Sequence, residues 1–252
     1  MTPAPDDLTV VRLADRPDLT GGMWELSDHW PRFMVEDPIG DLYYSRLADY
    51  PDHVLLAVDG DDRVWARGYG VPFAMGDDVG RPGLPDDGWD GVIRWAWLDS
   101  LVDRPATHLS ALEIMLHPDA RGSGLAGRML EALRDSARGA GLTGYVAPVR
   151  PSRKHLEPAT PMVDYVARTR DDGLPEDSWL RLHVRAGGRV VGVCPNAMTI
   201  SGTLDQWRAW TGLPFDATGP VEVPGALVPV HADVEHGVAV YVEPNVWVEH
   251  TV

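Results

Sequence analysis

The sequence is poor in several features, and each shortage excludes a class of protein. It has one cysteine, Cys194, in 252 residues, which excludes an internal disulfide framework and a cysteine-rich zinc site. No apolar run approaches the roughly 20 residues of a membrane-spanning helix. Residues 1–8 lack the basic and apolar blocks of a signal peptide. We therefore expect a cytoplasmic protein without a membrane partner or a metal centre.

Positive charge is also scarce. The chain has 22 Lys and Arg against 38 Asp and Glu, a formal net charge of −16, and Lys154 is its only lysine. A nucleic-acid-binding protein needs a basic face for the phosphate backbone, so the balance argues against a nucleic-acid partner. It suggests a cationic small molecule or basic peptide instead, although a generic solubilising surface explains the acidity at least as well.

The chain has the composition of a soluble globular protein, with 44% hydrophobic and 24% charged residues, and we expect a single domain over residues 1–252. Strand and helix patterns alternate, which favours an α/β or α+β class built around one sheet. The expected strands are 8–13, 54–58, 64–71, 109–116, 145–149, 189–194, 226–230 and 238–248. The expected helices are 18–30, 36–50, 89–101, 126–138, 162–168, 177–186 and 204–210.

Two regions extend beyond this regular pattern. The stretch 76–106 begins with many Gly, Pro and Asp residues and is expected to form a surface insertion. The segment 195–252 is expected to extend the domain at its C-terminal side. Cys194 follows an apolar run of strand character, so it is expected to be an inert core thiol rather than a nucleophile.

A glycine-rich turn follows strand 109–116 and precedes an amphipathic helix. Gly122, Gly124 and Gly127 match the dinucleotide-binding pattern G-x-G-x-x-G. Such a turn follows its strand directly and needs an acidic residue at the end of the next strand. Here five residues separate the strand from the first glycine, and residues 144–150 contain no Asp or Glu. An NAD(P)-dependent oxidoreductase is therefore only a minor alternative.

The surroundings of the turn fit a second interpretation. Arg121-Gly122-Ser123-Gly124-Leu125-Ala126 resembles the R/Q-x-x-G-x-G/A signature of the GNAT superfamily of acetyltransferases, and Ile114-Met115-Leu116-His117-Pro118 resembles the strand ending that precedes it. Strand, proline, Arg-Gly turn and amphipathic helix also follow in the family's order. The resemblance implies a central mixed sheet with a splayed parallel strand pair, flanked by helices.

The resemblance also implies a co-substrate, acetyl-CoA or another acyl-CoA, lying between the two splayed strands. Its pyrophosphate would be held by backbone N–H groups of residues 121–126, where the helix dipole adds partial positive charge. The backbone N–H of Leu116 would polarise the thioester carbonyl. The basic cluster 150–154 is either an anion site for a carboxylate or a coenzyme phosphate, or a solvated loop.

Three side chains are candidates for catalysis. The family commonly has a tyrosine as proton donor in a helix that ends Y-x-x-x-G, and this sequence has His183 there, followed by Gly187. An imidazole can donate or accept a proton at neutral pH, unless His183 only packs and hydrogen-bonds locally. Glu113, a carboxylate in an apolar strand, is either the base or a solvent-facing residue. Tyr145 on the neighbouring strand is the third candidate.

The sequence thus predicts an acyl-CoA-dependent acyltransferase that most simply transfers an acetyl group to a primary amine by direct attack. The alternative is a degenerate acyl-CoA-binding module, which the missing tyrosine would fit. The acceptor, a small-molecule or peptide amine, and the acyl chain length are not determined by the sequence. The oligomeric state is left open, with a homodimer as one option.

Overall fold

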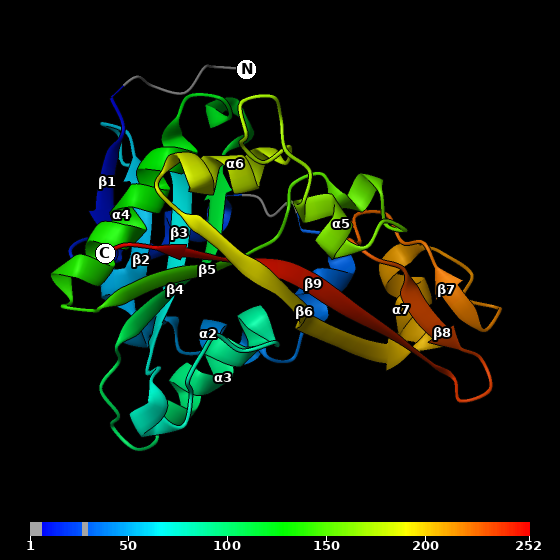
Figure 1. Ribbon diagram of the computed structural model, residues 1–252. Coiled ribbons are helices and arrows are strands. Elements are labelled where there is room, and N and C mark those ends of the chain that lie inside the picture. The colour runs from blue at the N-terminus through cyan, green and yellow to red at the C-terminus, as the bar shows by residue number, and fades with distance from the viewer. Residues whose placement is uncertain (1–6, 27–29) are drawn as a thin grey trace.

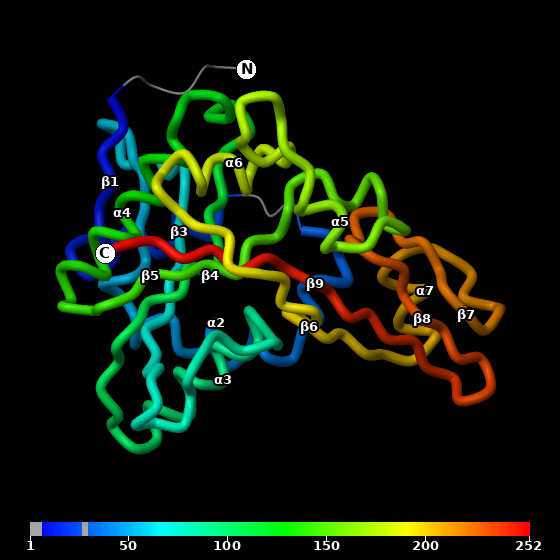
Figure 2. The backbone as a smooth tube through the Cα atoms, viewed as in Figure 1, coloured from blue at the N-terminus to red at the C-terminus, as the bar shows by residue number. Residues whose placement is uncertain are grey.

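A computed structural model describes residues 7–26 and 30–252, so the predictions for residues 1–6 and 27–29 lie outside the described residues. Nine strands form one sheet in the order β1-β2-β3-β4-β5-β9-β8-β7, with β6 paired to β9, and helices flank this sheet. Figures 1 and 2 show the path of the chain. The strands are β1 Thr9–Arg12, β2 Val54–Val58, β3 Val64–Phe73, β4 His108–Leu116, β5 Gly144–Val149, β6 Arg189–Thr203, β7 Gly219–Val221, β8 Val230–Asp233 and β9 Val238–His250.

The helices lie on both faces of this sheet. The α-helices are α1 Thr20–Glu25, α2 Gly40–Tyr44, α3 Gly88–Ser100, α4 Leu125–Gly139, α5 Met162–Val166, α6 Ser178–Arg185 and α7 Leu204–Thr211. The 3-10 turns are η1 Pro17–Leu19, η2 Arg32–Glu36, η3 Leu47–Asp49, η4 Pro51–His53, η5 Asp77–Val79, η6 Pro118–Ala120 and η7 Lys154–Leu156. No helix in the described ranges combines the length and the apolar character needed to cross a membrane.

Strand β2 shows how the sheet divides the core into two layers. Its five residues are all buried, and successive side chains point to opposite faces. Val54, Leu56 and Val58 join the core cluster that contains α2 and α3, whereas Leu55 and Ala57 join the cluster that contains α4 and α6. Figure 1 shows these two helix pairs on opposite sides of the sheet. The continuous apolar run of β2 therefore reflects burial on both faces.

Strands β4 and β5 form the parallel pair that the crossover pattern predicts. They pair only from His108 to Ser110 on β4, opposite Gly144 to Val146 on β5. Beyond Ser110 no pairing between the two strands is recorded, and β5 pairs with β9 on its other edge. The two strands therefore separate toward their carboxyl ends, as the expected splay requires.

The prediction that segment 76–106 forms a surface insertion is wrong for its helix α3, which belongs to the core. Trp89, Val92, Ile93 and Ala96 recur at helical spacing and are all buried in the larger core cluster. An apolar stripe of this kind packs a helix onto a sheet, and α3 contacts β3 and β6. The Gly/Pro-rich part, by contrast, is a loop, as expected.

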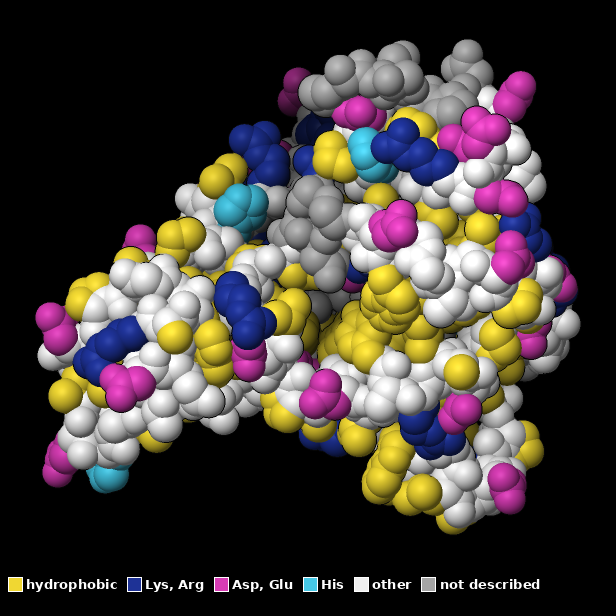
Figure 3. Space-filling view, turned by 180° about the vertical axis from the view of Figure 1, so that it is seen from behind, with side chains coloured by type: hydrophobic (Ala, Val, Ile, Leu, Met, Phe, Trp, Pro, Cys, Tyr) yellow, Lys and Arg dark blue, Asp and Glu magenta, His cyan; other side chains and the backbone are white. Residues whose placement is uncertain are grey.

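The C-terminal strands are longer than the sequence pattern suggested. The expected strand 189–194 continues to Thr203, because β6 and β9 form a long antiparallel ribbon with two irregularities in register. The expected strand 226–230 is wrong: the chain turns there, and β8 begins only at Val230. Figure 1 shows the ribbon, with α7, β7 and β8 at its end, projecting from the body as an arm, and in the reverse view of Figure 3 this arm is the protrusion at the left.

The prediction of two long N-terminal helices, over 18–30 and 36–50, is also wrong. Residues 18–26 and 30–50 form short helices and 3-10 turns instead, because Pro31 and Pro38 remove backbone donors and Gly21 and Gly22 have low helix propensity. The turn η2 has a structural role nonetheless. Its Phe33 ring lies 5.6 Å from the ring of Trp207 and 5.2 Å from that of Tyr241, so it packs the arm against the body.

Candidate active site

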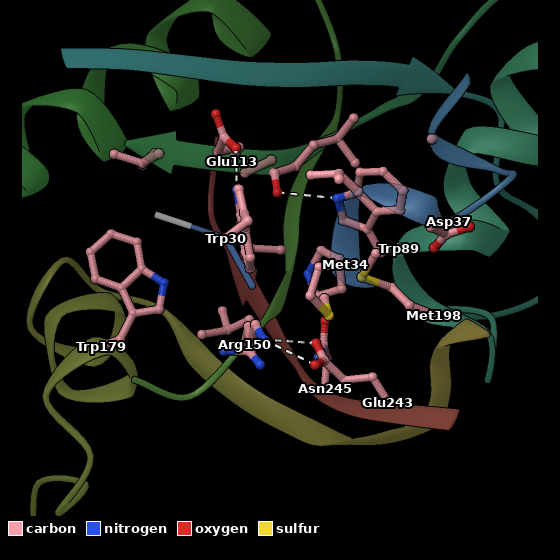
Figure 4. A pocket seen from close by; sticks show the side chains of 18 of the residues that line it. Trp30, Met34, Asp37, Trp89, Glu113, Arg150, Trp179, Met198, Glu243 and Asn245 are labelled. Carbon is pink, nitrogen blue, oxygen red and sulfur yellow. Dashed lines mark hydrogen bonds and ion pairs between the residues drawn. The ribbon is translucent and has the colours of Figure 1, made fainter. Parts of the chain in front are cut away.

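A cavity of about 440 Å³ occupies the space between the splayed strands, a volume in the usual range for small-ligand sites. Figure 4 shows it from close by, and Figure 3 shows a hollow between the arm and the body with hydrophobic side chains along it. Its strand walls are Ala111–Ile114 of β4 and Ala147–Val149 of β5. The remaining walls include Trp24, Trp30, Met34, Asp37, Tyr44, Arg67, Trp89, Arg150, Trp179, His183, Met198, Glu243 and Asn245.

A β-bulge in β4 lies at the wall of the cavity. Tyr69 of β3 pairs with Glu113 while the next residue, Gly70, pairs with Ala111, so Leu112 is the extra residue of the bulge. The Leu112 carbonyl accepts a hydrogen bond from Trp89 Nε1 at 3.2 Å. The bulge therefore redirects β4 at the point where the cavity begins.

The backbone of β4 beyond the bulge presents N–H groups to the splay. The N–H of His117 donates to the Trp65 carbonyl of β3 at 2.8 Å. Successive N–H groups of a strand point to opposite edges, so those of Leu116 and Ile114 point to the edge that faces β5. Ile114 lines the cavity, and Leu116 does not. Two donors thus face the space in which a thioester is expected.

The glycine turn has the conformation of an anion site. Gly122 and Gly124 have φ angles of 83° and 85°, which a residue with a Cβ adopts only at a cost, and α4 starts at Leu125. Within the described part of the chain, no acceptor is recorded for the N–H groups of Gly122, Gly124 and Ala126. The side chains of Arg121 and Ser123 are exposed beside them. These donors at a helix N-terminus suit a pyrophosphate.

Glu113 is buried in the cavity wall and held by two donors. Its Oε1 accepts from Arg67 Nε at 2.8 Å and its Oε2 from Trp30 Nε1 at 2.7 Å. Arg67 is buried as well, and its Nη1 donates to the carbonyls of Met23 and Leu26. Figure 4 shows the Glu113 carboxyl beside Trp30. The carboxylate is thus fixed in place at the splay, and it does not point to solvent from a half-exposed strand.

Two more carboxyl groups meet at another part of the cavity. Asp37, which lines it, is 5% exposed, and Asp90 of α3 is 4% exposed. Desolvation and the charge of Asp37 raise the pKa of Asp90 to about 9, and desolvation raises the pKa of Asp37. The two carboxyl groups are also hydrogen-bonded to each other, an arrangement that favours a proton shared between them.

Arg150 and Glu243 form a second buried ion pair at the cavity. Both Oε atoms of Glu243 accept from Arg150 Nε at 3.0 Å. Tyr241 and Asn245 also donate to this carboxylate, at 2.7 and 3.0 Å, and Arg150 lies over the ring of Trp30. The positive charge of Arg150 is thus already balanced. This bears on the predicted basic cluster 150–154, whose first residue is part of the cavity wall and not of a solvated loop.

His183 lies at the cavity but is almost fully buried. Its Nδ1 lies 3.0 Å from Nε2 of His250, and burial together with His250 lowers its pKa to about 3. The imidazole is therefore neutral at pH 7. Trp179, one turn earlier on α6, packs edge-on against the His183 ring.

Two other singled-out residues are buried away from the cavity surface. Tyr145 is 0% exposed, packs against His250 and does not line the cavity. Burial raises its pKa, and its hydroxyl has no hydrogen-bond partner among residues 7–26 and 30–252. Cys194 is buried, as expected for a core thiol, and burial raises its pKa to about 12, which disfavours the nucleophilic thiolate.

The sequence interpretation missed several residues of this site. Arg67, Asp90 and Glu243 each carry charge inside an apolar strand or helix stretch, which is the same signal that singled out Glu113. Asp37 and Trp30 lie in short irregular segments and give no comparable pattern. Long-range packing brings these five residues together from separate elements, and periodicity does not report such packing.

Comparisons with known proteins agree with this geometry. No protein-family model matches the chain. The arginine N-acetyltransferase avaD of Aspergillus versicolor is 33% identical to it, with 98% of this chain and 95% of that protein covered. The loading GNATL domain of CurA from Lyngbya majuscula has a TM-score of 0.56 at 15% identity, covering 97% of this chain and 96% of that one. The chain belongs to the GNAT superfamily of N-acetyltransferases.

A second solved GNAT structure, the GphF GNAT-like decarboxylase in complex with isobutyryl-CoA, has a TM-score of 0.52 at 16% identity, with 97% of this chain and 98% of that one covered. The predicted GNAT resemblance, the mixed α/β fold and the enzyme class are thereby confirmed. As a GNAT N-acetyltransferase, the protein transfers an acyl group from acyl-CoA to an amine. Among the described residues, the mixed sheet has one parallel strand pair, β4–β5, which disagrees with the dinucleotide-binding alternative.

Proposed function

We propose that the protein transfers the acetyl group of acetyl-CoA to an amine of arginine. The observation that carries this proposal is the cavity at the splay, where the fixed carboxylate of Glu113 and the acidic pair at Asp37 share one enclosed space. A cationic amine is attracted to such a space. The 33% identity to an arginine N-acetyltransferase over nearly the whole chain supports arginine as the acceptor.

In this proposal the backbone binds the co-substrate. Within the expected range 121–126, the free N–H groups of Gly122, Gly124 and Ala126 hold the pyrophosphate at the start of α4, where the helix dipole favours negative charge. The N–H groups of Ile114 and Leu116 donate to the carbonyl oxygens of the pantetheine and the thioester. A donor at the thioester oxygen stabilises the negative charge that develops there during attack. Ile114 is the better placed of the two, because it lines the cavity.

Glu113 acts as the base. It takes one proton from the ammonium of the acceptor, directly or through a water molecule, and the free amine attacks the thioester carbon. The carbon–sulfur bond then breaks, and the second proton lost by the nitrogen leaves with the coenzyme A thiol. Arg67 and Trp30 position the Glu113 carboxylate for this step.

His183 stays a candidate proton donor to the thiolate only in its neutral form, because its lowered pKa excludes the imidazolium near pH 7. Tyr145 stays a prediction with no contact to the cavity surface. We also keep the cytoplasmic location as a proposal.

The test is a thiol-release assay with acetyl-CoA and a panel of amines, combined with mass spectrometry of the product. The only cysteine is buried with a raised pKa, so released coenzyme A is the only readily reactive thiol in the assay. We expect acetylarginine to form at the rate of thiol release. Thiol release with other amines but not with arginine would contradict the proposed acceptor, and release with no amine would contradict the transfer itself.

A further inference from the structure

His183 of α6 and His250 of β9 form a hydrogen-bonded pair of imidazoles at the cavity wall. His183 Nδ1 lies 3.0 Å from His250 Nε2, and the two residues are 2% and 6% exposed. Burial lowers their pKa values to about 3 and about 4, so both rings are neutral at pH 7. A neutral imidazole has one N–H and one nitrogen lone pair. One ring of the pair therefore donates and the other accepts.

A second contact of His250 decides which ring donates. His250 also donates a ring hydrogen to the backbone carbonyl of Ala186. Its Nε2 is directed at His183, so the nitrogen that donates to this carbonyl is Nδ1. Because the neutral ring has only one N–H, Nε2 of His250 is an acceptor. The proton between the two rings consequently belongs to Nδ1 of His183.

The same assignment determines what His183 presents to the cavity. Its Nδ1 is turned to His250, which does not line the cavity, so the opposite edge of the ring, with Nε2, faces the cavity. Nε2 forms no hydrogen bond with a described residue, and it is not sealed from the surface as the Tyr145 hydroxyl is. With the proton on Nδ1, Nε2 carries a lone pair. The neutral ring thus offers the cavity an acceptor and no donor, which excludes a proton-donor role in this tautomer.

The position of α6 indicates which substrate meets this acceptor. α6 packs beside α4, as Figure 1 shows, and Arg134 of α4 donates to the Ala186 carbonyl at 3.3 Å. The N-terminus of α4 is the turn that we assign to the pyrophosphate. Figure 4 shows Trp179, one turn before His183, across the cavity from Trp89 and Asp37. His183 therefore lies on the coenzyme side of the cavity.

The coenzyme brings matching donors to this side. The only amide N–H groups of coenzyme A are those of its pantetheine arm. In a trans amide the N–H points away from the carbonyl oxygen. An amide whose oxygen is bound by the N–H groups of β4 therefore turns its own N–H away from β4. Inside an enclosed cavity such a donor needs an acceptor, because an unpaired buried donor is costly.

We propose that Nε2 of His183 accepts a hydrogen bond from an amide N–H of the pantetheine arm, and that His250 is the positioning residue that fixes His183 in this tautomer. The inference goes beyond the proposed function, since it requires coenzyme A but not a particular acceptor. His183 is then a coenzyme-binding residue. The proton that the thiolate gains comes from the attacking nitrogen and not from the imidazole.

Nitrogen-15 spectra of the histidine rings test the tautomer directly. In protein with labelled imidazoles at pH 7.5, the chemical shift distinguishes a ring nitrogen that carries a proton from one that carries a lone pair. We expect His183 to be protonated at Nδ1 and not at Nε2, with its signals assigned by their absence in His183→Gln. In His250→Phe the Nδ1–H loses its acceptor, and we expect both tautomers of His183. A proton on Nε2 in the wild type overturns the proposal.

Calorimetry with coenzyme A tests the hydrogen bond and needs no acceptor. We expect the Kd to rise about 10-fold in His183→Phe, which corresponds to the loss of one hydrogen bond. His183→Gln should keep a Kd close to that of the wild type, because its amide oxygen replaces the lone pair. His231→Phe, which changes an exposed histidine of β8, is the control and should leave the Kd unchanged. An unchanged Kd in His183→Phe overturns the proposal, whether or not arginine is acetylated.

Steady-state kinetics separate coenzyme binding from proton donation, with arginine or whichever amine of the panel is acetylated. We expect His183→Phe to raise the KM for acetyl-CoA and to leave kcat largely unchanged. Loss of a proton donor would instead lower kcat by about 100-fold or more without changing the Kd of coenzyme A, and that result overturns the proposal. If no amine is acetylated, the proposed function fails, while the spectra and the calorimetry still decide the role of His183.

Discussion

Arg67 Nε lies 2.8 Å from Oε1 of Glu113, and both side chains are almost fully buried at the wall of the cavity. Breaking a buried ion pair on one side leaves an uncompensated charge and typically costs about 3–5 kcal/mol. The same pair aims the proposed base at the splay. Stability and catalysis are therefore coupled at this position, and any test of Glu113 has to separate them.

For Glu113→Gln we expect a loss of kcat of about 100-fold or more with arginine, since the amide is no base. We also expect a loss of unfolding free energy of about 3 kcal/mol. Urea unfolding and steady-state kinetics below the transition measure both. The double variant Arg67→Met/Glu113→Gln removes both charges and should recover part of the stability without recovering kcat. Recovery of kcat along with stability would show that Glu113 is only structural.

The sequence was sufficient for the parts of the fold that local patterns determine. The hairpin β2–β3, the apolar face of α4 at Met129, Leu130 and Leu133, and the signature turn all lie where predicted. In each case the signal is a turn residue or a periodicity within some 15 residues. Such signals do not depend on the rest of the chain.

The rest of the site depends on contacts between distant segments. Trp30 lies 83 residues from Glu113, and the Asp37 to Asp90 pair joins the segment after η2 to α3. Leu112 is a bulge only because of its register with β3. The extent of β6 to Thr203 is likewise set by its pairing with β9. None of these relations leaves a periodic trace in the sequence.

The second prediction concerns the signature turn. For Gly124→Ala we expect a loss of about 1–2 kcal/mol of stability, because φ is 85° there and the Cβ meets no atom within 4 Å, so the cost is conformational. The shifted backbone should also raise the KM for acetyl-CoA about 10-fold or more. Gly139→Ala is the matched control, since that residue lies in α4 in open space without a positive φ. This control should leave the KM for acetyl-CoA unchanged. Equal effects of the two variants on that KM would contradict the proposal that the turn binds the coenzyme.

The third prediction follows from the pair of buried imidazoles. Burial lowers the pKa of His183 to about 3 and that of His250 to about 4, below the value of about 6.5 in an unfolded chain. Between pH 6.5 and pH 4 the unfolded state therefore binds more protons than the folded state does. The free energy of unfolding consequently falls as the pH decreases from 6.5 toward 4. Urea midpoints measured from pH 7.5 to 4.5 check this. His183→Phe should reduce the change of the urea midpoint with pH. An unchanged pH dependence in this variant would show that the two imidazoles do not cause it.

The last prediction concerns Lys154, the only lysine of the chain. It is fully buried, and its Nζ donates to the carbonyls of Leu227 at 2.7 Å, Glu157 at 2.8 Å and Pro158 at 3.4 Å. Because all three N–H bonds are used inside the protein, we expect acetic anhydride to label Lys154 in urea but not in the native state.

Lys154→Met should cost about 1–3 kcal/mol, since the buried carbonyls lose their donor. The neighbouring exposed Arg153→Met should cost less than about 0.5 kcal/mol. Tryptic mass spectrometry and thermal unfolding provide the readouts. Labelling of Lys154 in the native state, or equal losses of stability in the two variants, would contradict the stabilising role of the buried Lys154 ammonium. With Lys154 protected, the protein carries no exposed lysine amine of its own that competes with the acceptor for acetyl-CoA.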